Sequence, residues 1–437
     1  MENLLLKVLE LQKQGKQVGI WSACTANALV LEAAMRHALE TNTILLIEAT
    51  ANQVDQYGGY TGMKPVDFVR MIKELSAKTG FPESRLVLGG DHLGPLTFSK
   101  YNEDKAMEEA KELVRQYVAA GFTKIHIDTS MKVADDDPNA RLSDAVIARR
   151  GAELAIVAEE AYSKLREVNK NAVHPVYIVG SEVPIPGGAQ ETTGGVQVTK
   201  TEDFRNTVAT FEKAFADAGV GKAWKYVIGV VVQPGVEEKD AGCTEYDRTK
   251  AADLMASIKE FPTLMFEGHS TDYQTKYKLR ELVEDGVGIL KVGPALTFAL
   301  REGLFALAYA EKEAYRHEED KQSRFIETLD AAMLANPVYY KKYYTGTDAE
   351  IELKRKYSFS DRCRYYLPDK DVQKAMETLF ENFSNGVPLN LLSQFMPIQY
   401  KKVREGTLKN SPQDLVFDRV SNTIDDYLFA THQEVIG

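Results

Sequence analysis

The chain has 437 residues, of which 44% are hydrophobic and 27% charged, and its formal net charge is −11. This acidic balance argues against nucleic acid or an anionic membrane as the main partner, because phosphate binding draws on clustered Lys and Arg. Three cysteines without a pair motif favour a reducing compartment over a disulfide framework. With no signal-peptide pattern and no apolar run of about 18 residues, we expect a cytoplasmic protein without a membrane span.

Eight short apolar segments read as buried strands, since a parallel strand covered on both faces is a nearly continuous apolar run. Segments with helical periodicity lie between them. This alternation predicts a TIM (β/α)₈ barrel over residues 1–300, with a doubly wound open sheet as the main alternative. The predicted strands are 17–24, 43–50, 86–92, 124–130, 176–182, 226–233, 263–269 and 289–293, and the predicted helices are 65–79, 105–119, 142–168, 202–219, 248–260 and 273–285.

The pattern changes after about residue 300, where no further strand is indicated. Helical periodicity recurs over 302–318, 320–336, 369–384 and 411–431, and a stretch rich in Tyr and Arg occupies 338–368. No linker rich in Gly, Ser or Pro separates this region from the barrel. We therefore predict that residues 301–437 form a helical C-terminal extension packed on the barrel.

Acids and histidines follow several predicted strands, at the end where a parallel barrel carries its active site. An imidazole and a carboxylate at one site can bind a metal and move a proton. We expect a mixed nitrogen and oxygen site for Zn²⁺, Ni²⁺, Mn²⁺ or Co²⁺, although the spacing does not select the metal. Hydrogen-bonded pairs in loops are the structural alternative. The candidates are Asp91, His92, His126, Asp128, Glu182, Glu267 and His269.

Amide, hydroxyl and carboxylate side chains near the predicted barrel mouth suit a hydroxyl-rich ligand such as a sugar. A hydrogen-bonded loop explains the residues after strand two equally well. For Lys291, on strand eight, we expect an ion pair rather than the function of a Schiff-base amine. For Arg362 and Arg364 we expect pairing with acids of the extension rather than binding of a phosphate or carboxylate ligand. The substrate-binding candidates are Glu48, Asn52, Gln53, Tyr60, His126, Gln233 and Lys291.

Several long motifs are also similar to those of one protein family. They include YGGYTGM at 57–63, GGDHLGP at 89–95, HSTDYQT at 269–275 and the segments 290–302 and 360–368. In these motifs the chain resembles the tagatose-bisphosphate aldolase Z-type subunits (GatZ/KbaZ-like), which are relatives of the metal-dependent class II aldolases. The resemblance covers nearly the whole chain, and it implies a TIM barrel and a function in carbohydrate metabolism.

The resemblance also implies functions for individual residues. By the match to the class II aldolases, Asp91 is the catalytic acid/base and His92 a metal ligand. Glu182 and His269 match further metal-site positions, and Asp128 is an additional ligand. The aldolases carry a metal-binding His after strand six, where this chain has Gln233. We therefore expect a site of Asp, Glu and two His in place of the three-histidine site.

Two functions follow from the resemblance. The leading hypothesis is a metal-dependent C4 epimerase of a ketohexose or ketohexose phosphate, of the tagatose/fructose type, working by retro-aldol cleavage and re-addition. Asp91 would move the proton, and Glu182 or Glu267 would be the complementary acid/base. The alternative is a non-catalytic stabilising subunit of a class II tagatose-1,6-bisphosphate aldolase complex.

A third hypothesis is a barrel that binds a sugar without catalysing a reaction. The expected partners are a small sugar, a class II aldolase subunit and further copies of the same chain.

Overall fold

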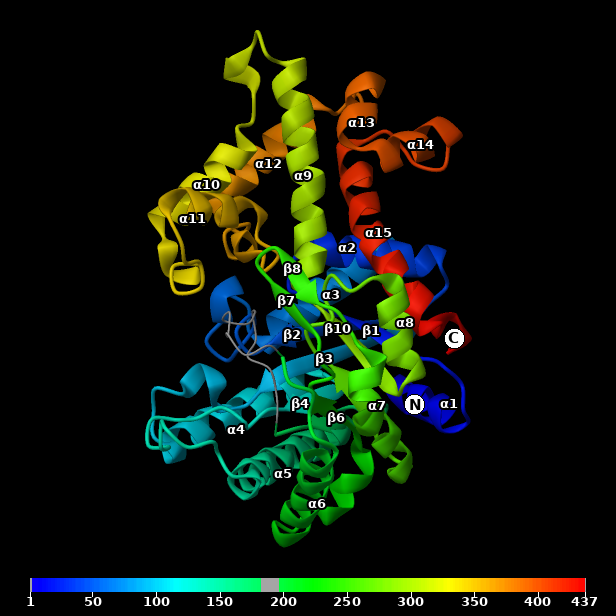
Figure 1. Cartoon of the computed structure of the whole chain (residues 1–437), viewed down its shortest axis with the longest axis vertical. Helices are drawn as coiled ribbons and strands as arrows, with labels where there is room; N and C mark the ends of the chain where they lie inside the picture. Colours follow the sequence, from blue (N-terminus) through cyan, green and yellow to red (C-terminus); the bar gives the residue numbers. More distant parts are fainter. Residues whose placement is uncertain (1, 182–195, 437) are drawn as a thin grey trace.

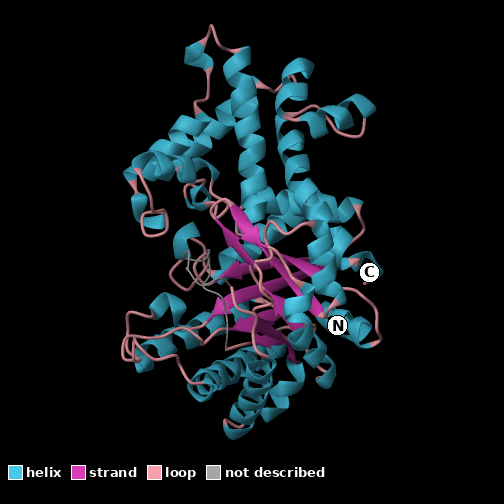
Figure 2. Ribbon diagram, in the orientation of Figure 1, coloured by secondary structure: helices cyan, strands magenta, loops and turns pink. Residues whose placement is uncertain are grey.

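A closed barrel of eight parallel strands forms the centre of the protein (Figure 2), in a computed structural model that describes residues 2–181 and 196–436. The strands follow the order β1-β10-β9-β6-β5-β4-β3-β2. Pairing of β1 with β10 closes the sheet, so the predicted TIM barrel is confirmed and the open sheet is wrong. The strands are β1 (Ile20–Cys24), β2 (Leu45–Thr50), β3 (Leu86–Leu93), β4 (Lys124–Ile127), β5 (Val176–Val179), β6 (Val227–Val232), β9 (Met265–Gly268) and β10 (Val287–Val292).

Helices surround the barrel, and local sequence signals set their ends. The helix after β3, for example, begins where the Asn102 side chain accepts a hydrogen bond from the Lys105 amide, and it ends at Gly121, whose φ is 99°. Helices α3 to α8 correspond to the six predicted between the strands, and α9 overlaps the predicted helix 302–318, whereas α2 has no predicted counterpart. The helices are α1 (Leu4–Lys13), α2 (Ala28–Glu40), α3 (Pro65–Thr79), α4 (Glu103–Ala120), α5 (Asp144–Val168), α6 (Thr201–Asp217), α7 (Arg248–Ser257), α8 (Lys276–Glu284) and α9 (Pro294–Ala314).

The C-terminal region is helical, as expected. Helix α9 leaves the barrel directly after β10, and α15 packs along α9, α8 and α2 (Figure 1). The Tyr- and Arg-rich stretch contains a helix, α11, that the sequence pattern did not reveal. The domain division at residue 300 stays a prediction, because α9 runs through this position. The remaining helices are α10 (Phe325–Ala335), α11 (Asp348–Tyr357), α12 (Lys370–Asn382), α13 (Leu389–Phe395), α14 (Pro397–Glu405) and α15 (Pro412–Thr431).

The barrel interior is layered along its axis, because alternate strand residues point inward. At the N-terminal end, Ile20, Leu46 and Ile289 pack with Leu5 and Val8 of α1. One alternation further along the strands, the inward positions become charged. The next inward positions carry imidazoles and an acid. The charged layer consists of Glu48, Lys124, Glu267 and Lys291, and the layer above it contains Asp91, His126 and His269.

A small hairpin after β6 ties the extension to the barrel mouth. Its strands are β7 (Glu237–Lys239) and β8 (Gly242–Thr244). At its turn, the Asp240 carbonyl accepts a hydrogen bond of 2.8 Å from the Phe359 amide, and the Asp240 carboxylate accepts one of 2.6 Å from the Ser358 hydroxyl. Lys354 lies 2.9 Å from the same carboxylate. Residues of the extension therefore lie over the C-terminal ends of the strands. No helix in the described ranges is both long and apolar enough to span a membrane.

The end of the extension also closes onto the first two strands, which yields a stability prediction. The buried Gln433 side chain donates to the Ile44 carbonyl at 2.8 Å and accepts from the Trp21 amide at 3.2 Å. Changing Gln433→Ala leaves both main-chain groups unpaired, so we expect the free energy of unfolding to fall by about 1–3 kcal/mol. Urea denaturation measures it. Glu434→Ala, at an exposed neighbour, is the control and should change little.

Candidate functional site

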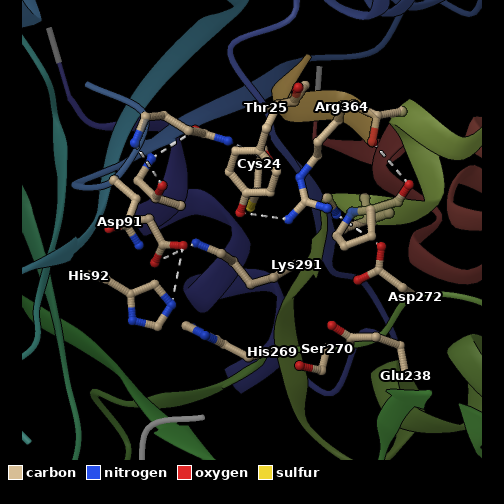
Figure 3. A pocket seen from close by; sticks show the side chains of 18 of the residues that line it. Cys24, Thr25, Asp91, His92, Glu238, His269, Ser270, Asp272, Lys291 and Arg364 are labelled. Atoms are coloured by element: carbon tan, nitrogen blue, oxygen red, sulfur yellow. Dashed lines mark hydrogen bonds and ion pairs between the residues drawn. The ribbon is translucent and has the colours of Figure 1, made fainter. Parts of the chain in front are cut away.

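A pocket opens at the C-terminal ends of the barrel strands (Figure 3). Asp91, His92, His269 and Lys291 line it from the barrel side. The extension contributes Arg364 and Tyr365, and the hairpin contributes Glu238. Of the predicted site residues, the pocket is lined by Asn52, Gln53, Tyr60, Asp91, His92, His269 and Lys291.

The backbone of β3 is distorted at the position where two neighbouring side chains must both reach the site. Adjacent residues of a regular strand face opposite sides. His92 has a φ of 51°, and the pairing of β3 with β4 shifts register between Gly90 and Leu93. This left-handed conformation is costly for a residue with a Cβ. It allows Asp91 and His92 to line the same pocket.

Three imidazole rings form a compact triangle beneath the pocket. The ring centroids of His92, His126 and His269 lie 5.1, 5.0 and 5.2 Å apart. They come from β3, from β4 and from the segment that follows β9. His126 was expected to contact a ligand or the substrate and was assigned to the substrate, with two histidines expected at the metal site. The geometry instead makes His126, from strand four, the third histidine of the cluster.

A carboxylate holds each imidazole through one ring nitrogen. Asp128 lies 2.8 Å from Nδ1 of His92, and Glu267 lies 2.9 Å from Nε2 of His269. Such a carboxylate–histidine pair fixes the ring orientation in metal sites and leaves the other nitrogen for the ion. Both acids are fully buried, and neither is among the pocket-lining residues. Their positions therefore favour orienting functions over the predicted ligand function of Asp128 and the predicted catalytic function of Glu267.

The remaining histidine has a buried nitrogen without a partner. His126 Nδ1 lies 2.8 Å from Asp91 Oδ1 and 3.1 Å from the His92 amide nitrogen. It cannot donate to the first and accept from the second at once. The charge-assisted bond to Asp91 is the stronger. This tautomer leaves a bare lone pair on Nε2, for which the described residues provide no hydrogen-bond partner.

Two of these imidazoles, with two carboxylates, form a donor set that fits a divalent metal. One ligand atom each from Asp91, His126, Glu267 and His269 lies within 4.8 Å of the others. Imidazole and carboxylate donors suit Zn²⁺, Mn²⁺, Ni²⁺ or Co²⁺. The orphaned Nε2 of His126 is the observation that speaks most directly for an ion, because a buried polar atom without a partner is costly.

Two lysines neutralise the carboxylates below the cluster. Lys124 Nζ lies 2.7 Å from both Glu48 and Glu267. Lys291 Nζ lies 2.8 Å from Glu48 and from Asp91. The ion pair that sequence analysis preferred for Lys291 is present. A Cβ at position 89 would come within 2.6 Å of Glu48 Cγ, so glycine at this position makes room for the acid.

These contacts set the protonation states at the site. Burial raises the pKa of Asp91, but His92, Lys291 and His126 outweigh it and hold that pKa well below its usual value. Burial lowers the pKa of Lys291, yet Asp91, Glu48 and Glu267 keep it well above the usual range. The lysine thus stays an ammonium, which disfavours Schiff-base chemistry. Burial lowers the pKa of His269 to about 3, so its imidazole is neutral, as a metal ligand requires.

One predicted residue, Gln233, does not join this site. The Gln233 side chain turns into its own loop, where Oε1 accepts hydrogen bonds from the amides of Gly235 and Val236. It is not among the pocket-lining residues. Glu182, predicted as both catalytic and metal-binding, lies outside the described residues.

The pocket also contains groups that the sequence analysis did not assign to it. Asp272 accepts hydrogen bonds from the amides of Gly293 and Ala295 at the start of α9. Burial and the charge of Glu238 raise its pKa to about 7. Glu238 lies on a hairpin that was not predicted. Arg364 and Tyr365 were not predicted to reach the pocket, because no local pattern brings the extension over the barrel mouth.

Together these features define a (β/α)₈ barrel protein with a buried acid–imidazole cluster under a pocket at the strand ends. A family model described as D-tagatose-1,6-bisphosphate aldolase subunit GatZ/KbaZ-like matches residues 5–432. The chain belongs to this family.

Named relatives agree with this membership, and one solved structure is similar over nearly the whole chain. The GatZ subunit of D-tagatose-1,6-bisphosphate aldolase from Salmonella heidelberg (strain SL476) is 44% identical over 430 residues, which are 98% of this chain and 99% of the relative. The Salmonella agona (strain SL483) protein of the same name matches equally, at 44% identity over the same shares of both chains. A crystal structure from Sinorhizobium meliloti 1021, described as a probable tagatose 6 phosphate kinase, is 41% identical with a TM-score of 0.85, and the match covers 94% of this chain and all of that one, 100%.

The charged layer leads to a second stability prediction. Changing Lys124→Met removes the shared partner of two buried carboxylates, and we expect the free energy of unfolding to fall by about 3–5 kcal/mol. The control is Lys111→Met, which removes an ion pair with Glu153 at the surface and should cost less than about 1 kcal/mol. Urea denaturation at neutral pH compares the two. A small loss for Lys124→Met would mean that the carboxylates take up protons and that the layer is not ionic.

Proposed function

We propose that this chain acts in ketohexose metabolism as a Z-type subunit of a tagatose-1,6-bisphosphate aldolase, with a barrel pocket that binds a ketohexose. The observation that carries the proposal is 44% identity to GatZ subunits across 98% of the chain. This function was the alternative hypothesis from the sequence, and the named relatives favour it over the autonomous enzyme. The pocket supports the sugar, since acids, amides and hydroxyls line it beside aromatic rings.

A second candidate is an autonomous metal-dependent C4 epimerase of the tagatose/fructose type. The triangle of carboxylate-held imidazoles favours it, because a purely supporting subunit needs no such arrangement. A divalent metal bound there would polarise the carbonyl and hydroxyl oxygens of a sugar.

The residues of the chain suit the remaining steps of such a reaction. Asp91, ionised in the pocket, would take the proton of the C4 hydroxyl while the C3–C4 bond breaks to give an aldehyde and an enediolate. The Lys291 ammonium, 2.8 Å from Asp91, would offset the negative charge that develops. Rotation of the aldehyde, re-formation of the bond and return of the proton would invert C4. Glu267 would keep His269 in position.

Activity of the isolated chain separates the two candidates. We expect the purified chain to raise the activity or stability of a class II tagatose-1,6-bisphosphate aldolase when the two are mixed. An epimerase would in addition interconvert fructose and tagatose, or their 6-phosphates, without that partner. This turnover would be lost with EDTA and would fall by at least about 100-fold in Asp91→Asn. If neither effect occurs with any of Zn²⁺, Ni²⁺, Mn²⁺ and Co²⁺, both functions are wrong.

Metal content tests the cluster independently of turnover. We expect His126→Gln to weaken binding of the metal by more than Asp128→Asn does, because the first removes a ligand and the second only its orientation. Loss of an orienting partner typically costs about 10–100-fold in affinity. Elemental analysis and titration with Zn²⁺ measure both. His174→Gln is the control, since His174 contacts Glu159 and Tyr226 away from the pocket. Equal affinity in wild type and His126→Gln would exclude His126 as a ligand.

A further inference from the structure

The roof of the pocket contains a guanidinium that forms no ion pair with a carboxylate of the described residues. Arg364 lines the pocket together with Tyr60 and Tyr365, and it enters from the side opposite to His92 (Figure 3). Its Nη1 donates to the main-chain carbonyls of Ser360 and Asp361, and its Nη2 donates to the Tyr365 hydroxyl at 3.1 Å. In the part of the chain that the structure describes, Arg364 forms no ion pair with a carboxylate. Sequence analysis expected such a pair.

The acid in the same segment, Asp361, directs its carboxylate to other partners. Asp361 directs Oδ1 towards Nε of Arg301 at 3.5 Å, and its Oδ2 accepts a hydrogen bond of 2.5 Å from the Thr297 hydroxyl. Asp361 therefore offers Arg364 its main-chain carbonyl and not its carboxylate. Arg364 is half-buried, and a partly desolvated cation without a paired carboxylate carries a cost. An anion arriving in the pocket would offset that cost.

Packing holds the segment around Arg364 in place. The Phe359 ring stacks on Tyr273 with centroids 4.1 Å apart, and the Tyr273 hydroxyl donates to the Phe359 carbonyl at 2.6 Å. The Tyr365 ring meets Tyr60 at 4.6 Å and Tyr339 at 4.9 Å. Arg364 is thus positioned by aromatic contacts and carbonyls, which leave its charge available to a ligand.

The neighbouring arginine behaves differently. Arg362 donates from Nη1 to the Tyr339 carbonyl at 2.9 Å, and its guanidinium lies 3.1 Å from the centre of the Tyr343 ring. It is buried and is not among the pocket-lining residues. The structural function expected for both arginines therefore fits Arg362 alone.

We propose that Arg364 binds a terminal anionic group of the sugar, a phosphate or a carboxylate, while the hydroxyls of the sugar face Asp91 and Lys291. This inference rests on the proposal that the pocket binds a ketohexose. The planar guanidinium matches both anions, since each can accept two parallel hydrogen bonds from it. The C-terminal extension would then contribute directly to substrate selection.

Binding measurements on the full-length chain test the inference without requiring turnover. Isothermal titration compares fructose, fructose 6-phosphate and fructuronate. We expect one of the two anionic sugars to bind at least about tenfold more tightly than fructose, in keeping with a charge-assisted hydrogen-bonded pair. Arg364→Gln should remove this preference, and Arg364→Lys should retain part of it. Arg362→Gln is the matched control, which should preserve the preference even if it lowers the melting temperature.

The outcomes separate the inference from the function on which it rests. A preference for fructose 6-phosphate identifies the group as a phosphate, and a preference for fructuronate identifies it as a carboxylate. Equal binding of fructose and both anionic sugars, or an unchanged preference in folded Arg364→Gln, overturns the inference and leaves the sugar pocket standing. Absence of binding for all three sugars overturns both. Arg364→Lys provides a folded comparison if Arg364→Gln does not fold.

Discussion

A layer of paired charges inside the barrel is the constraint on which the site depends. Three carboxylates, Glu48, Glu267 and Asp91, share two ammonium groups, those of Lys124 and Lys291. Among these five groups the carboxylates outnumber the ammonium groups by one, in an interior that is closed below by apolar side chains. Imidazoles share the excess, because Asp91 also contacts His126 and the adjacent buried acid Asp128 contacts His92. A cation bound at the level of these imidazoles would therefore be favoured.

The barrel could be predicted from the sequence because its strands are buried on both faces. Segments such as 226–233 are apolar throughout, and this pattern does not depend on distant contacts. Two of the elements that escaped prediction lack such a local pattern. The hairpin that contains Glu238 has strands of only three residues each and is held by hydrogen bonds to Ser358 and Phe359. Helix α11 is polar, with few buried side chains, so its apolar periodicity is weak.

The candidate site was predicted in part, for a similar reason. Residues at strand ends, such as Asp91 and His269, could be assigned to one edge of the barrel from position alone. Their partners could not. The left-handed backbone at His92 breaks the alternation on which the prediction relied. From the resemblance to the aldolases, a third histidine was expected only after strand six, where this chain has Gln233. In the structure the third imidazole comes from strand four. Arg364 lies in a segment whose path over the barrel has no local signature.

The charged layer by itself does not distinguish an enzyme from a supporting subunit. Each of its carboxylates has a cationic or imidazole partner, so the layer stabilises the fold whether or not a reaction occurs above it. The informative groups are a ring nitrogen without a hydrogen-bond partner and a guanidinium without a paired carboxylate among the described residues. Nε2 of His126 has no hydrogen-bond partner among the described residues, and the Arg364 guanidinium has no counter-ion there. Both are costly to the fold. A divalent metal would accept the lone pair of His126 Nε2, and an anionic group would accept hydrogen bonds from Arg364. A sugar with an anionic terminus, held with a divalent metal, would therefore relieve both costs.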